Sequence, residues 1–135
     1  MWKHPRVVQI LAVLTVFALA AVSTWWEQTR AAQQSSLVFG QPYQCVGRGE
    51  IGQEYRIPLI LTSKDKNVLL EWAAGQQRGM GFVDSGNRLV AVFVSAGIDG
   101  VGIVSYRLEG GRLVGEWTSG DGQIYPETCT LGAAA

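Results

Sequence analysis

The sequence predicts an all-β fold, most simply a small antiparallel up-and-down barrel of about eight strands. From Tyr43 onward apolar and polar residues alternate with a period of two, which is typical of half-buried strands. All seventeen glycines lie at or beyond Gly40. Glycine-bearing turn signals recur about every ten residues, with no helical segment between them, and this spacing indicates an antiparallel meander.

Each predicted strand is a short alternating segment that ends at a turn. The strands are expected at Tyr43–Arg48, Glu54–Thr62, Asn67–Ala74, Arg78–Val83, Arg88–Ser95, Gly102–Leu108, Arg112–Thr118 and Gln123–Leu131. The turns between them contain Lys64–Asn67, Asp84–Asn87, Asp99-Gly100, Gly110-Gly111 and Gly120–Gly122. Gly, Asn and Asp dominate these turns because they tolerate a positive φ.

Two turns predict the register of the last three strands. If Gly110-Gly111 is a two-residue hairpin loop, Tyr106 lies opposite Gly115. If Gly120–Gly122 is a three-residue loop, Gly115 in turn lies opposite Glu127. One face of these strands then carries Val104, Tyr106, Leu108, Leu113, Trp117, Tyr125, Glu127 and Cys129, and we expect this face to point inward. Glycine beside large rings leaves room for them.

The two cysteines, Cys45 and Cys129, lie near the two ends of the strand-forming region. An even number of cysteines in an exported protein favours a disulfide. In a closed barrel the first and last strands are neighbours, so the cysteines can meet, whereas an open sheet keeps them at opposite edges. A two-sheet sandwich is an alternative because it also brings the ends together.

The N-terminal segment, residues 1–26, is predicted to be an apolar helix that directs export. Lys3, His4 and Arg6 precede a long apolar stretch, Val7–Val22. Small residues at its end are typical of a cleaved signal peptide, whereas continuation to Trp25-Trp26 would suit an uncleaved membrane anchor. In either case we expect a periplasmic or extracellular domain, released or attached to the membrane by this segment. The predicted parts that follow are a linker (27–41), the barrel (42–132) and a tail (133–135), and Leu37–Phe39 within the linker is expected to touch the domain.

The pattern from Tyr43 to Leu131 resembles the small exported up-and-down barrels of the lipocalin and avidin type. Those families carry a Gly-x-Trp near the first strand, but here Gly115-Glu116-Trp117 lies on the seventh, so no functional residue is transferred by motif. The order of Trp72, Gly-x-Gly pairs, Gly-x-Trp and a late Glu127 also looks like that of short exported bacterial domains. That likeness implies location more than activity.

The candidate ligand-binding residues are the carboxyl and the rings expected on the inner face. They are Glu127, Tyr106, Trp117, Trp72, Tyr55 and Tyr125, with Phe93 beside them. Glu127 could bind a ligand amine or hydroxyl, since an inward carboxyl among rings has few competing partners. The alternative is that the rings fill a compact core and that a tyrosine or backbone N–H satisfies Glu127.

The sequence offers few residues for catalysis or metal binding. The only histidine is His4, so the domain lacks the usual triad, and no catalytic residue, metal ligand or cofactor is predicted. Beyond residue 23 nine Lys and Arg accompany eleven Asp and Glu, a net charge of −2 that gives no reason to expect nucleic acid. A hydrolase would need Glu127 together with Glu116 or Glu71.

Alternation, however, places Glu71 and Glu116 on the outer face, where we expect ion pairs with arginine. The arginines expected there are Arg107, Arg88 and Arg56. The sequence therefore favours a non-enzymatic module of the cell envelope that binds a small apolar molecule or a protein surface. A membrane-anchored accessory domain acting through protein contacts is the alternative, and a carboxylate-based hydrolase is a more remote one.

Overall fold

The structure, a computed structural model, describes residues 37–96 and 100–132 of the chain. Eight strands follow one another, with one short turn of 3₁₀ type, η1, after the third. They are β1 (Pro42–Arg48), β2 (Glu54–Lys64), β3 (Asn67–Trp72), η1 (Ala73–Gly75), β4 (Gln77–Val83), β5 (Arg88–Ser95), β6 (Val101–Glu109), β7 (Arg112–Thr118) and β8 (Tyr125–Leu131). The region after Tyr43 is therefore all-β in the described residues, as predicted.

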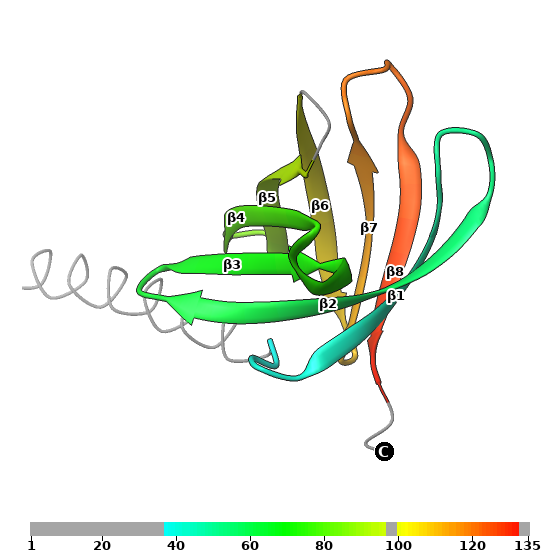
Figure 1. Cartoon of the computed structure of the whole chain (residues 1–135). Helices are drawn as coiled ribbons and strands as arrows, with labels where there is room; N and C mark the ends of the chain where they lie inside the picture. The colour runs from blue at the N-terminus through cyan, green and yellow to red at the C-terminus, as the bar shows by residue number, and fades with distance from the viewer. Residues whose placement is uncertain (1–36, 97–99, 133–135) are drawn as a thin grey trace, which may run out of the picture. The chain divides into compact units, whose positions relative to one another are not determined.

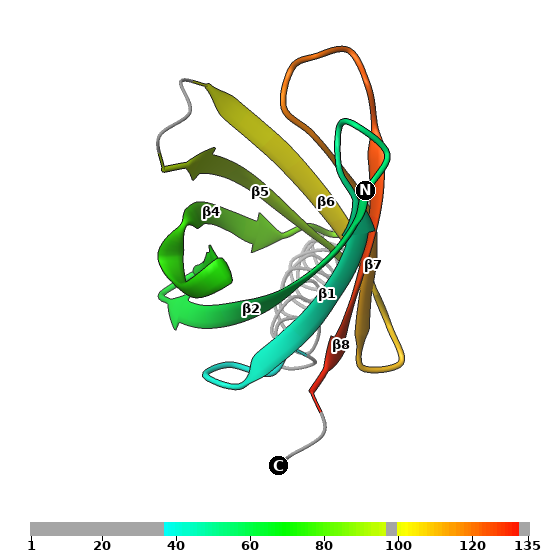
Figure 2. The ribbon, with the colours of Figure 1, turned by 45° about the vertical axis from the view of Figure 1, so that its right-hand side comes forward.

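The eight strands form a closed antiparallel barrel, which confirms the predicted architecture over the sandwich. Each strand pairs with the next, and β8 returns to pair with β1, so these two strands lie side by side in both views (Figures 1 and 2). In Figure 1 strands β2–β4 lie across the page, whereas β6–β8 run up it. This change of direction around the barrel follows from the tilt of strands in a small closed sheet. The predicted N-terminal helix lies outside the described residues, and none of the described segments is a helix long and apolar enough to cross a bilayer.

A disulfide joins the two strands that close the barrel. Cys45 on β1 and Cys129 on β8 are register partners, 84 residues apart in sequence, and their sulfur atoms are bonded. Neither cysteine is exposed to solvent. The predicted bridge is therefore confirmed, and it crosses the one strand pair that links the two ends of the domain.

The predicted register of the last three strands is also confirmed. Tyr106 is the partner of Gly115, and Gly115 is the partner of Glu127. The first of these pairings follows from a tight turn in which Gly110 and Gly111 both have positive φ, at 53° and 80°. Such a turn matches the twist of the strands that it joins.

Several predicted strand boundaries are wrong, and the second strand runs to Lys64 rather than ending at Thr62. The third strand ends at Trp72 rather than at Ala74, because Ala73 and Ala74 adopt left-handed φ values of 48° and 55° in η1. Alanine disfavours this conformation, so nothing in the local sequence signals the turn before Gly75. The last strand begins at Tyr125 rather than at Gln123.

One end of the barrel is filled by side chains. Short turns join β2 to β3, β4 to β5 and β6 to β7 there, and the inward residues include Tyr43, Leu61, Val68, Leu89 and Leu113, all buried. Leu37 is buried with them, and Val38 and Phe39 pack against this core. The Tyr43 hydroxyl accepts a hydrogen bond from the Val38 backbone N–H at 3.0 Å. Part of the segment before β1 thus belongs to the core and closes this end.

Candidate ligand-binding cavity

The other half of the barrel is hollow. A cavity of about 460 Å³ lies among the strands, which is within the usual range of small-molecule sites. Its lining comprises Tyr55, Ile57, Trp72, Gln77, Phe93, Val104, Tyr106, Trp117 and Glu127, with Gly49, Glu50, Ile51, Gln53, Ala73 and Gln76 from the β1–β2 loop and the η1 region. The predicted residues therefore enclose a space rather than filling it.

A smaller hollow of about 300 Å³ adjoins this cavity at the same end of the barrel. The two share Glu50, Gln77, Phe93 and Trp117, and the smaller one extends to Asp121 in the β7–β8 loop. The Ser119 hydroxyl donates a 2.6 Å hydrogen bond to the Glu50 carboxylate, which links the β7–β8 loop to the β1–β2 loop.

Inward-facing glycines explain why this half of the barrel has room. Gly47, Gly79, Gly102 and Gly115 occupy positions in the inward alternation of β1, β4, β6 and β7. A Cβ on Gly102 would lie 2.1 Å from the Phe93 ring, so this ring can lie against β6 only because the side chain is missing. On Gly115 a Cβ would lie 2.0 Å from a backbone oxygen, that of Ser105.

Glu127 lies at the centre of a row of residues that crosses five neighbouring strands. The register places Tyr55, Gly47, Glu127, Gly115 and Tyr106 in line across β2, β1, β8, β7 and β6. The two tyrosines reach over the two glycines toward the carboxyl from opposite sides. A side chain at Gly47 would lie 2.3 Å from the Tyr55 hydroxyl, so the glycine is what lets this ring reach Glu127.

Both carboxyl oxygens of Glu127 accept a phenolic hydrogen bond. The Tyr55 hydroxyl donates to Oε2 at 2.6 Å, and the Tyr106 hydroxyl donates to Oε1. The Trp117 indole N–H in turn donates to the Tyr55 oxygen at 2.8 Å. The hydroxyl protons of Tyr55 and Tyr106 are thus both directed toward the Glu127 carboxyl. Glu127 itself is only 5% exposed.

Burial raises the pKa of Glu127 above its ordinary value of 4.5, and this effect outweighs the opposing hydrogen bonds from Tyr106, Tyr55 and the Trp72 indole. The same burial, together with the charge of Glu127, raises the pKa of the Tyr106 and Tyr55 hydroxyls. Desolvation disfavours the charged form of each group. The two phenols therefore keep their protons, while the carboxyl is the group that titrates first as the pH rises.

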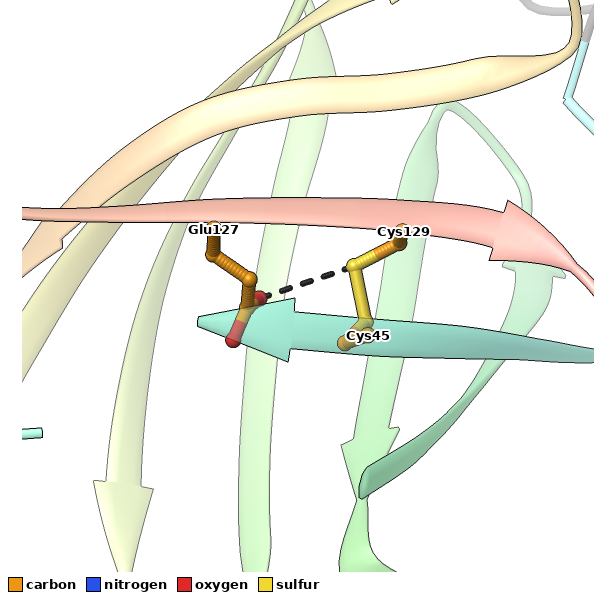
Figure 3. A group of neighbouring side chains, drawn as sticks. All are labelled: Cys45, Glu127 and Cys129. Carbon is orange, nitrogen blue, oxygen red and sulfur yellow. Dashed lines mark hydrogen bonds between the residues drawn. A yellow bond between two sulfur atoms is a disulfide. The ribbon is translucent and has the colours of Figure 1, made fainter. Parts of the chain in front are cut away.

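The disulfide lies directly beside this carboxyl (Figure 3). The Cys129 sulfur is 3.6 Å from Glu127 Oε1. Because a disulfide sulfur has no proton, any hydrogen bond here is donated by the protonated carboxyl. Cys45, Cys129 and Glu127 are close enough together to surround a metal ion, but bonded sulfurs offer no thiolate to one.

Aromatic rings form part of the cavity wall. The centroid of the Phe93 ring lies 5.7 Å from that of Trp72 and 6.3 Å from that of Trp117, both in tilted or edge-on contact. Tyr125 stacks on Trp117 at 4.5 Å but is not among the cavity-lining residues. Its hydroxyl donates to Asp121, and this bond raises the pKa of Tyr125 to about 12.

Five of the six candidate ligand-binding residues thus meet around one cavity, and Tyr125 supports it from behind Trp117. The carboxylates of the hydrolase hypothesis do not meet, because Glu71 and Glu116 are exposed on the outer face. The predicted partners of these two acids are wrong. Glu71 lies 3.9 Å from Arg78, its cross-strand neighbour, while Arg107 and Arg56 lie close to Glu109 and Glu54.

Sequence reasoning missed Gly47 and Glu50 as parts of this region. The position of Gly47 could have been found from the β1–β2 hairpin. Arg48 and Glu54 are the pair next to the loop, so Gly47 is the partner of Tyr55. The position of Glu50 at the mouth depends on how that loop folds back over the opening, and no local pattern indicates it.

Comparison of the chain with protein-family models, curated proteins and solved structures finds no match.

Proposed function

We propose that this domain is an exported, non-enzymatic binding module that takes one small, largely apolar molecule into the open half of its barrel. One observation carries the proposal: a cavity of about 460 Å³ with aromatic walls and one carboxyl at its base. Ligand sites in proteins have this character, mostly apolar with a few placed polar groups. The buried disulfide supports export, since such bonds persist in oxidising compartments.

The cavity can be tested with an uncharged fluorescent probe, N-phenyl-1-naphthylamine. We expect the probe to gain fluorescence with the protein and to quench tryptophan emission, because Trp72 and Trp117 line the space. Trp117→Ala should weaken binding by roughly tenfold, in line with the loss of a buried aromatic contact. Phe82→Ala is the matched control, since Phe82 is an aromatic residue exposed on the outer face.

Loss of probe binding in Phe82→Ala but not in Trp117→Ala would place the probe on the outer surface and contradict the proposal. The proposal would also be contradicted if the probe showed no gain in fluorescence with the protein, because the interior would then exclude it.

A second candidate function, an accessory domain acting through protein contacts, is supported by a different feature. Strands β4, β5 and β6 expose a continuous apolar surface on the outside of the barrel. This outer patch consists of Met80, Phe82, Val92, Val94, Val101 and Ile103, each about half exposed or more. Its members are cross-strand neighbours, for example Met80 with Val92 and Val92 with Ile103. Exposed apolar patches of this kind mark interaction surfaces.

For this second candidate the simplest occupant to test is another copy of the chain. Sedimentation velocity should then show self-association that Val92→Thr with Ile103→Thr abolishes. If the protein sediments as a monomer at all concentrations, with or without these substitutions, the outer patch does not mediate self-association.

A further inference from the structure

We infer that the ligand of the cavity is an organic cation, with its positive charge at Glu127 and its apolar body among the aromatic walls. The inference rests on the proposed function and adds the chemical class of the ligand. It depends on three features of the described residues: the sign of the charges around the cavity, the direction of the hydrogen bonds at its base, and the nature of its walls.

The charged residues that line the cavity and the adjoining hollow are all acidic. Glu127 and Glu50 line the cavity, and Glu50 and Asp121 line the adjoining hollow. No lysine or arginine lines either space within the described residues. A recess lined by one sign of charge attracts ligands of the opposite sign and repels anions.

The base of the cavity offers hydrogen-bond acceptors rather than donors. Each tyrosine hydroxyl has one proton, and both protons are directed at Glu127. The indole N–H of Trp117 is already donated to Tyr55. An ionised carboxylate has about four acceptor positions, and Tyr55, Tyr106 and the Trp72 indole take three, so roughly one remains for a ligand. The group that fits there is a donor, and an ammonium is the strongest such partner because its hydrogen bonds to carboxylate are charge-assisted.

The walls complete the fit. Trp72, Phe93 and Trp117 surround the space next to the carboxyl. Tryptophan and phenylalanine faces attract cations, and cages of such rings hold organic ammonium groups in other proteins. An ion with an apolar body would place that body against these rings, while an inorganic cation would leave them without a partner.

The test compares three probes of one shape: 4-phenylbutylammonium, 4-phenylbutan-1-ol and 4-phenylbutanoate, titrated calorimetrically. We expect the ammonium to bind at least roughly tenfold more tightly than the alcohol, because its hydrogen bond to the carboxylate joins two charged groups. The carboxylate should bind more weakly than the alcohol. Glu127→Gln should remove most of the preference for the ammonium over the alcohol, measured as the ratio of the two affinities in the same variant. Glu116→Gln, on the outer face of the neighbouring strand, is the matched control.

A quaternary analogue, 4-phenylbutyltrimethylammonium, adds a pH readout because its own charge does not titrate. Around Glu127 the titratable neighbours are Tyr55 from β2 and Tyr106 from β6, which stay protonated; the Cys45–Cys129 disulfide and the indoles of Trp72 and Trp117 do not titrate. Affinity for this probe should therefore fall as the pH drops and Glu127 is protonated. Glu127→Gln should abolish that dependence.

The outcomes separate the two proposals. If the alcohol binds the cavity and the ammonium binds no better, the cation assignment is overturned while the binding function stands. If none of the three probes binds, both fail. If the pH dependence persists in Glu127→Gln, the assigned role of Glu127 is wrong.

Discussion

At the scale of single residues, Glu127 combines burial with two hydrogen-bonded phenols. A buried carboxyl is costly to ionise, and its position between Tyr55 and Tyr106 offsets only part of this cost. The same residue thus lowers stability when it ionises, and it is the carboxyl at the base of the cavity. Such a combination is expected of groups whose placement serves binding rather than folding.

The raised pKa of Glu127 predicts how stability depends on pH. The folded carboxyl binds its proton more tightly than the unfolded one, whose pKa is near 4.5. In the range between those two pKa values the native state holds more protons, so the free energy of unfolding falls as the pH rises. Denaturant titrations from about pH 4 to about pH 8 should show the stability of the natural protein decreasing relative to Glu127→Gln.

The comparison uses the difference between the two proteins because every other titrating group contributes to both. A difference that stays flat, or that favours Glu127 at higher pH, would contradict the raised pKa.

The Tyr106 hydroxyl has a specific effect on this carboxyl. Tyr106→Phe removes one donor from the buried group, so we expect a loss of about 1–3 kcal/mol at neutral pH. The pKa of Glu127, followed by NMR, should rise further. Tyr43→Phe is the control, since Tyr43 is equally buried but lies at the filled end of the barrel, where its hydroxyl contacts Val38. A shift of the Glu127 resonance in the control as large as in Tyr106→Phe would refute the specific coupling.

At the scale of the strands, alternating glycine and aromatic positions shape the interior. The row across β2, β1, β8, β7 and β6 works because two glycines separate the three polar side chains. Strands are usually weakened by glycine, which costs backbone entropy and packs nothing. Here the missing side chains allow rings to cross to the neighbouring strand and leave the space above them open.

Gly47→Ala tests this arrangement. The new methyl group would lie 2.3 Å from the Tyr55 hydroxyl and 2.9 Å from the backbone oxygen of Pro126, so Tyr55 must move away from Glu127. We expect a loss of about 1–3 kcal/mol and a change in tryptophan fluorescence, because Trp117 loses its acceptor.

Gly86→Ala is the control for this substitution, since its nearest neighbour, an Asp84 oxygen, is 3.4 Å from the added atom. Equal losses in both variants would show that the effect comes from glycine content and not from the contact with Tyr55.

At the scale of the whole molecule, closure of the barrel depends on the pairing of β1 with β8. This pair joins the two ends of the domain, and the disulfide constrains it. Every other neighbouring pair is joined by a loop between consecutive strands. Strands β1 and β8 are therefore held to each other by one hydrogen-bonded ladder and one covalent bond.

Replacement of both cysteines, Cys45→Ala with Cys129→Ala, should lower the free energy of unfolding by about 4–5 kcal/mol, because the bridge closes a loop of more than eighty residues. Amide hydrogen exchange should increase most in β1 and β8. If exchange increases uniformly, or if non-reducing mass analysis finds two free thiols in the natural protein, the closure mechanism is wrong.

The sequence by itself determined the strand order, the inward face of the last three strands and the position of Glu127 on it. These features follow from local chemistry: a period of two, and a Gly110-Gly111 turn whose length sets the pairing of its flanking residues. The disulfide could be expected because closure and the cysteine positions agree. Each of these inferences needs only neighbouring segments of chain.

The tertiary structure alone decided that half of the barrel is hollow and that Tyr55 and Tyr106 both reach Glu127. Those facts depend on how side chains from distant strands share the interior volume, and no local pattern specifies that volume. The end of β3 and the pairing of Glu71 with Arg78 were missed for a related reason. Ala73 and Ala74 take left-handed conformations that their residue type does not favour, and the turn that results sets the contacts beside it.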